Sequence, residues 1–317
     1  MEQIVRLILI RLFLVVITFI IVSALVFVAV EWLPGDPATR VLGRGGTEER
    51  RQVLREQMHL DDPPMVRYIR WFTDFIRGDW GDSLIANRPV TDYVIPRSKN
   101  TIILAGFAMA VYIPLSLVLG IVTAVHRHRF FATVLSTLTL IGTSTPEFVV
   151  GILLLLVFAV ELKWFPPLAL VDQAQSPLEV LHFLTLPMLT LVAAVTAYAV
   201  RMMQSSLIPV MESEYVRTAT LKGLSRRSVI LRHALPNALG PALRVTTLNI
   251  AWLIGGVVLV EAVFSYPGLG RLLVNSVTML DTPVIEAVTV ILSAVFVLTN
   301  LGADIVSILL NPRLRKG

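Results

Sequence analysis

Six stretches of this chain are long and apolar enough to cross a lipid bilayer as helices. A membrane-spanning helix needs about 20 predominantly apolar residues, because each residue advances the helix by ~1.5 Å and the hydrocarbon core is ~30 Å thick. The segments that meet this requirement are residues 12–30, 102–125, 132–160, 186–203, 245–264 and 284–310. The fourth is the weakest, because Pro187 opens it and Arg201 closes it. Only 15% of the 317 residues are charged, against about a quarter in soluble domains. We therefore expect an all-α polytopic membrane protein with six transmembrane helices.

The basic residues predict which helix ends face the cytoplasm, because Lys and Arg accumulate in short cytoplasmic loops. Residues 204–244 alone hold six of them, while the loops 161–185 and 265–283 hold one each. The other basic segments are 1–11, 126–131 and 311–317. This asymmetry predicts that both termini are cytoplasmic. It also indicates that the net charge of +5 serves contact with membrane lipids and not with nucleic acid.

The chain divides into three parts. Residues 1–30 form a tail and the first span, because the apolar run is longer than the ~7–15 residues of a signal peptide core and no clear small-x-small cleavage site follows. A cleaved signal peptide is the alternative. Residues 31–99, with eleven acidic and eleven basic side chains, are expected to be a small extracytoplasmic insert, since long loops translocate regardless of charge. Residues 100–317 form the helical core, including the loop 204–244.

No catalytic or cofactor-binding pattern is visible. The chain has no G-x-x-x-x-G-K-[ST], H-E-x-x-H or G-x-S-x-G motif, and it has no cysteine. His126 and His128 flank an arginine in a short basic loop, where an anchor to the inner membrane surface is a better interpretation than a metal site. We expect no enzyme activity, no metal and no cofactor in this chain.

The loop 204–244 has more structure than a topological signal requires. Ser213 can cap a first helix that runs to Lys222, and Gly223 stands where a left-handed residue ends a helix. Ser225 can cap a second helix, 226–235, before Pro236. A plain basic loop against lipid headgroups remains the alternative. Val229, Ile230 and Leu231 supply an apolar band among cations, which favours docking into a groove of a partner protein.

At these residues the chain resembles the membrane permease subunits of ABC importers, in the dipeptide, oligopeptide and nickel branch. The signature of that family is EAA-x3-G-x9-I-x-L-P before the penultimate span. The matching positions here are Arg217, Thr218, Ala219, Gly223, His233, Leu235 and Pro236. Arg217, Thr218 and His233 depart from the signature, but R-T-A-x-x-K-G-L-S, here with Lys222, Leu224 and Ser225, is common in the peptide branch. The blocks WLPGDPA, VEAVFSYPGLGRLL and NPRLRKG are also similar to that family.

The resemblance implies a coupling role for this loop and a set of partners. It implies that Arg217, Thr218, Ala219, Lys222, Gly223, Leu224, Ser225, Leu235 and Pro236 dock on an ABC ATPase. It also implies two ATPase subunits that carry ATP and Mg, a second homologous permease in a heterodimer, and an extracytoplasmic solute-binding protein. The expected location is a bacterial or archaeal cytoplasmic membrane, and the expected direction is import.

A polar stripe on the third predicted span is a candidate solute pathway. Its members are Ser136, Thr139, Thr143 and Glu147, which share one helix face at offsets of 3, 7 and 11. Packing between helices through hydroxyl groups is the alternative that we favour. Glu261, Glu286 and Asp304 are expected to have structural partners, the first two near water at the outer ends and Asp304 with a basic residue of the inner surface.

Two other functions remain open at this point. A secondary transporter or channel would work without ATP, but such carriers often show inverted repeats, and none is visible here. A membrane-embedded enzyme would need a paired nucleophile and base, and none is found. The sequence does not choose among peptides, nickel chelates, glutathione, opines and sugars as cargo.

Overall fold

The computed structural model describes residues 2–32, 38–39, 47–57 and 59–310. Among these, the side chains of residues 2–5, 7–8, 54, 57, 240–248, 251, 254 and 306–310 lie outside the description. The C-terminal block NPRLRKG and most of WLPGDPA also lie outside it.

The regular secondary structure of the described residues is helical, apart from one isolated β-bridge between Asp82 and Pro89. The helices before the bend are α1 (Glu2–Glu31), α3 (Glu48–Gln57), α4 (Pro64–Arg77), α5 (Thr91–Val125) and α6 (Phe130–Ser144). After it come α7 (Glu147–Leu154), the π-helical segment η2 (Leu155–Glu161), the 3₁₀ turn η3 (Val171–Gln173) and α8 (Pro177–Met211). The last elements are α9 (Glu214–Leu221), α10 (Arg226–Ser228), the π-helical segment η4 (Val229–Ala234), α11 (Leu235–Val263), α12 (Leu269–Met279) and α13 (Thr282–Leu310).

Four helices in the described part of the chain are long and apolar enough to span a membrane. They are Leu9–Glu31, Thr91–Val125, Pro177–Met211 and Thr282–Ile305, and a fifth span results if the bent pair Phe130–Ser144 and Glu147–Glu161 counts as one. The helix α11 covers the predicted fifth segment and, at 29 residues, is about 43 Å long.

The third predicted span is not the single helix that we expected over 132–160. It breaks between α6 and α7, and the chain bends by 114° between Phe130–Ser144 and Glu147–Glu161. Thr145 has extended backbone angles, φ −100° and ψ 125°, because the ring of a following proline disfavours the helical region in the residue before it. Pro146 then opens α7. The hydropathy of the segment indicated a span, and the proline divides it.

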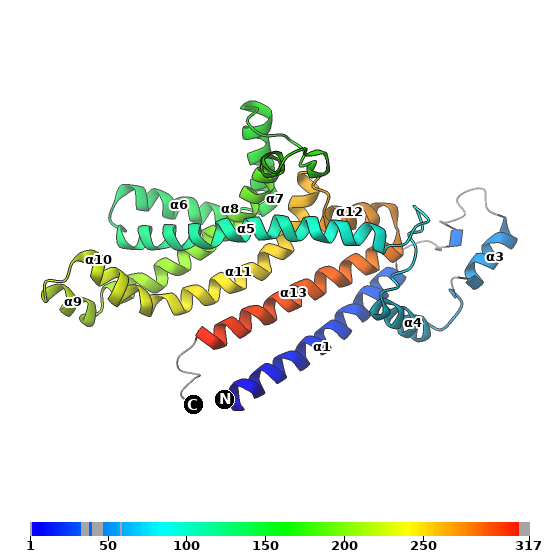
Figure 1. Cartoon of the computed structure of the whole chain (residues 1–317), viewed down its shortest axis with the longest axis horizontal. Helices are drawn as coiled ribbons and strands as arrows, with labels where there is room; N and C mark the ends of the chain where they lie inside the picture. The colour runs from blue at the N-terminus through cyan, green and yellow to red at the C-terminus, as the bar shows by residue number, and fades with distance from the viewer. Residues whose placement is uncertain (1, 33–37, 40–46, 58, 311–317) are drawn as a thin grey trace.

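The predicted fourth span, which looked weakest in sequence, is the central helix of the bundle. Ser176 caps α8 by accepting a hydrogen bond from the Glu179 amide at 3.3 Å. The buried face of α8 packs between α5 and α11 (Figure 1), around a core that includes Tyr112, Leu191 and Phe264. Pro187 lies within the helix and is buried there, as transmembrane helices tolerate when neighbouring helices surround a proline.

The two ends of the bundle carry different elements (Figure 1). The elbow formed by α9 and α10, the turn between α5 and α6, the beginning of α1 and the end of α13 all lie at one end. The helices α4 and α12 lie at the other. The helix α4 rests on α1, where Tyr68 shares a hydrogen bond of 2.9 Å with Ser23 and packs edge-on against Phe27. Insert residues 64–77 are therefore folded onto the first long helix.

Candidate functional site

The first helix of the elbow is α9, which begins after Ser213 as the sequence predicts. The hydroxyl of Ser213 does not cap it, because this group donates a hydrogen bond of 2.6 Å to the Val210 carbonyl instead. The Glu214 carboxylate lies in the first turn, where the positive end of the helix dipole stabilises an anion. The position of the helix start was predicted correctly, and the predicted side-chain cap was wrong.

Gly223 ends α9 in the left-handed conformation that the sequence predicts, with φ +77°. The Leu224 amide bonds to the Ala219 carbonyl at 3.4 Å and the Gly223 amide bonds to the Thr220 carbonyl at 3.0 Å. This pair of bonds is a Schellman motif, which satisfies carbonyls that the helix end would leave unpaired. A Cβ atom at Gly223 would meet nothing within 4 Å, so only the backbone conformation requires glycine.

The second half of the elbow does not end at Pro236 as we expected. Ser225 caps it by accepting a bond from the Ser228 amide at 3.4 Å. The helical path then continues through α10 and η4 directly into α11, with Pro236 in the first turn of α11. The widened π-helical turns precede the proline, whose missing N–H and fixed φ suit a first helical turn. The elbow is therefore joined to α11 without a flexible linker.

One face of the elbow is buried against the bundle. Val216, Ala219 and Val229 are at most 7% exposed and pack with Met203 and Leu207 of α8. In addition, the Arg226 guanidinium donates a bond of 3.1 Å to the carbonyl that ends α5. Ala219, a predicted coupling residue, thus contributes by packing, and a movement of the elbow would be transmitted to α5 and α8.

The other face of the elbow presents apolar side chains among cations. Tyr215, Leu221 and Leu224 are 46%, 80% and 41% exposed. The predicted residues around them are also exposed, namely Arg217, Thr218, Lys222, Gly223, Ser225 and Pro236, whereas Leu235 is half-buried. Sequence reasoning missed Tyr215 and Leu221, whose exposure depends on which face of α9 packs on α8.

The predicted polar stripe divides at the bend between α6 and α7. Ser136 accepts a bond of 2.9 Å from the Gln204 amide of α8, and Thr139 is buried and bonds to the Ser136 carbonyl. These two side chains pack helices together. Thr143 and Glu147 instead line a cavity of about 730 Å³ between the bend, α8 and α11.

Buried and aromatic side chains complete this cavity. Asn249, which is 6% exposed, donates a bond of 2.9 Å to the Tyr112 hydroxyl. Tyr198 and Trp252 are 50% and 73% exposed and also line it. None of these residues stood out in the sequence, because an isolated Asn or aromatic residue in an apolar helix carries no pattern.

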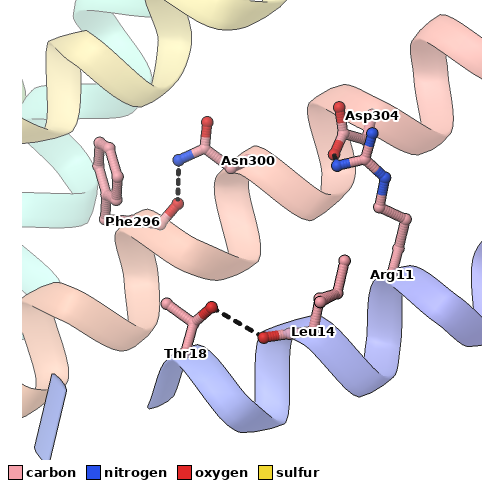
Figure 2. A network of polar contacts seen from close by, with 6 residues as sticks. All are labelled: Arg11, Leu14, Thr18, Phe296, Asn300 and Asp304. Atoms are coloured by element: carbon pink, nitrogen blue, oxygen red, sulfur yellow. Dashed lines mark hydrogen bonds and ion pairs between the residues drawn. The ribbon is translucent and has the colours of Figure 1, made fainter. Parts of the chain in front are cut away.

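Two of the three other carboxylates have clear structural partners. Asp304 on α13 forms an ion pair of 2.8 Å with Arg11 on α1 (Figure 2), as the sequence predicts. Glu261 is fully buried, not close to water as we expected, and accepts bonds from the Thr101 hydroxyl at 2.7 Å and the Gly270 amide at 2.6 Å. Glu286 is half-buried and within electrostatic range of Arg67. No metal-binding group of three or more His, Cys, Asp or Glu occurs among the described residues.

Comparison with known proteins gives matches over nearly the whole chain. Residues 116–316 match the family described as "Binding-protein-dependent transport system inner membrane component". Residues 4–105 match the N-terminal membrane component of the same kind of transport system. The glutathione transport system permease protein GsiC of Escherichia coli (strain K12) is 39% identical over 298 residues, which cover 94% of this chain and 95% of that protein. The proteins of the same name from Salmonella typhi and Salmonella paratyphi A match with the same identity and coverage.

Proposed function

Because this chain belongs to the family of binding-protein-dependent transport system inner membrane components, we propose that residues 214–236 couple it to the ATPase of its transport system. The chain is a multi-pass inner-membrane permease subunit of an ABC importer. As such a subunit it is not an enzyme and binds no cofactor of its own. Its system also includes a binding protein and an ATPase.

The proposed topology has six transmembrane segments with both termini in the cytoplasm. The bent pair of α6 and α7 is one of these segments, and α11 is another. Supporting this, the basic segment 126–131, the elbow, the beginning of α1 and the end of α13 lie at one end of the bundle, as positive-inside topology requires. The insert 31–99 is then extracytoplasmic and available to the binding protein.

The observation that carries the coupling proposal is the two-sided character of the elbow. Its inner face is fixed to α8 through Val216 and Ala219, while Tyr215, Leu221 and Leu224 remain exposed outward. Exposed apolar side chains with a rim of Arg and Lys fit a helix-in-groove contact with another protein. ATPase closure would then pull on a rigid unit that continues into α11.

The proposed assembly is a heterodimer with a second homologous permease, two ABC ATPase subunits and one solute-binding protein. One chain supplies one elbow and therefore engages one ATPase subunit. The proposed cargo is a dipeptide, an oligopeptide or a related small solute, on the support of the 39% identity to glutathione transport permeases. The candidate pathway in this half of the transporter is the cavity that Thr143 and Glu147 line, with Ser136 and Thr139 as packing residues behind it.

Leu221 offers a direct test, because it is 80% exposed and its replacement leaves the core of the fold intact. The tagged chain is extracted in mild detergent with its partners, and copurifying subunits and ATPase activity are measured. We expect Leu221→Asp to lose the ATPase subunits. The matched control is Leu178→Asp, at a leucine that is 77% exposed in the first turn of α8, which should retain them.

Each outcome of this test is informative. If the Leu221→Asp variant recovers as much ATPase as the unmodified chain, the elbow is not part of the ATPase interface. Purification of the unmodified chain alone, without an ATPase, would contradict the assembly and favour a carrier that works without ATP. Recovery of a second copy of this chain in place of a different permease would replace the heterodimer with a homodimer.

A further inference from the structure

The hydroxyl groups at the bend between α6 and α7, which line the cavity, have their hydrogens engaged. The hydroxyl groups of Thr143, Ser144 and Thr145 all donate their hydrogens to backbone carbonyls of the preceding turn, at 2.9, 3.1 and 2.8 Å. Each of these oxygens can still accept a hydrogen bond through its lone pairs, but its own hydrogen is already engaged. The Asn249 amide nitrogen donates to the Tyr112 hydroxyl and also contacts the Val195 carbonyl at 3.5 Å. The nitrogen of this side-chain amide is therefore engaged, and its oxygen is the group that can accept a further bond.

Glu147 is the one charged residue on the described lining. No Lys, Arg or His lies on this lining, and no hydrogen bond or ion pair is found between the Glu147 carboxylate and any other residue that the structure describes. The amides of Val149 and Val150 bond to the Pro146 carbonyl, so the carboxylate does not cap α7 through them. A carboxylate inside a membrane segment is costly without a partner.

A glycine of the neighbouring helix α11 leaves room for this carboxylate beside the cavity. A Cβ atom placed on Gly256 of α11 would lie 2.7 Å from a carboxylate oxygen of Glu147. Any larger residue at position 256 would push the carboxylate away. Tyr198 and Trp252 add exposed aromatic faces, which attract cations through their ring electrons.

We propose that Glu147 determines specificity by receiving an ammonium group of the solute as it passes this cavity. An ammonium has three donors and one positive charge, and it matches the hydroxyl acceptors at the bend, the one carboxylate and the two aromatic faces of this lining. The inference rests on the proposed function, because it places the cavity on the solute pathway. It adds the chemical class that this half of the pathway selects, namely solutes with a free amino group.

The absence of cysteine from the chain allows a test that does not depend on knowing the cargo. Thr143→Cys places one thiol in the cavity of the intact complex, in membrane vesicles. Its rates of modification by a trimethylammonium-bearing and a sulfonate-bearing methanethiosulfonate reagent of similar size are measured. Each rate is divided by that reagent's rate with a small free thiol in solution, because a thiolate reacts faster with the cationic reagent even without the protein. We expect the cationic reagent to be faster by about tenfold, as for one charge-assisted contact of ~1.4 kcal/mol. Adding Glu147→Gln should reduce this ratio to about one.

Two further variants separate charge from structure. Gly256→Ala keeps the carboxylate but displaces it, so it should lower the ratio without abolishing it. Glu161→Gln removes an exposed carboxylate at the end of η2, away from the cavity lining, and should leave the ratio unchanged. An equal ratio with and without Glu147, or a thiol that neither reagent reaches, would overturn the inference.

Uptake measurements then distinguish this inference from the proposed function. Vesicles with the complete complex are tested with glutathione and dialanine, each with and without an N-acetyl group. Glu147→Gln should lower ATP-driven uptake of the free amines at least about tenfold relative to the unmodified complex, with ATPase subunits still bound. Uptake independent of ATP would refute the proposed function while the labelling result stands. ATP-driven uptake that Glu147→Gln leaves unchanged would refute only the role of Glu147.

Discussion

Replacing Gly223 with alanine strains the elbow without creating a steric clash. Gly223 has φ +77°, and a Cβ atom there would meet nothing within 4 Å. An L-residue in the left-handed region costs about 1–2 kcal/mol, so the native elbow loses that much stability relative to a right-handed alternative. If ATPase docking requires the native elbow, the apparent dissociation constant of the ATPase subunit rises by up to about 5–30-fold.

A series at this position tests the reasoning. Gly223→Asn should weaken docking least, because Asn tolerates the left-handed region, Gly223→Ala should be intermediate, and Gly223→Val should be worst, because a β-branched residue tolerates it poorly. Titration of purified ATPase subunits onto each variant in detergent gives the dissociation constants. Gly78→Ala is the control, since Gly78 ends α4 with φ +89° and equally open surroundings. Equal affinity across the series, or the same loss with Gly78→Ala, would refute the argument.

Three predictions concern the stability of the bundle, measured as the melting temperature of the complex in detergent. Thr101→Val removes a hydrogen-bond donor from the buried carboxylate of Glu261. It should cost about 1–3 kcal/mol of stability, which is more than a change from threonine to valine at an exposed position costs. An unchanged melting temperature would contradict this role of Thr101. Gly120→Leu should destabilise strongly, because even a Cβ atom would lie 2.5 Å from a methionine of α8, and an unchanged melting temperature would mean that α5 and α8 are packed differently. For the pair of Arg11 and Asp304, whose side chains are 50% and 34% exposed, a double-mutant cycle with alanine should give a coupling of at most about 1 kcal/mol, and a larger value would indicate a desolvated pair.

The elbow could be predicted well because its determinants are local. The left-handed end of α9 needs only Gly223, and the start of α10 needs only the Ser225 hydroxyl, which bonds three residues ahead. Its exposed face could not be predicted in the same way. Val229 was expected to share an apolar band with Ile230 and Leu231, but it is buried while Leu231 is 48% exposed. Packing against α8 decides which apolar side chains remain for a partner.

The polar stripe on the third predicted span was predicted less well than the elbow, because its geometry depends on a bend. A regular helix would place Ser136, Thr139, Thr143 and Glu147 on one face, and the bend at Pro146 removes that regularity. The proline was visible in the sequence, but transmembrane helices often contain proline without breaking. Pro187 in α8 is such a case. Neighbouring helices decide which prolines bend a span.

The sequence by itself determined the membrane class, the basic end of the bundle and the position of the elbow, because hydropathy, charge and turn residues act over a few neighbouring positions. Tertiary structure alone decided which residues meet across the bundle. Asp304 pairs with Arg11, and Glu261 accepts a hydrogen bond from Thr101, although the partners lie far apart in the sequence. Glu147 lines a cavity and its carboxylate lies against Gly256 because α6 and α7 bend and α11 packs beside them. Such pairings depend on how helices dock, and no local pattern encodes that docking.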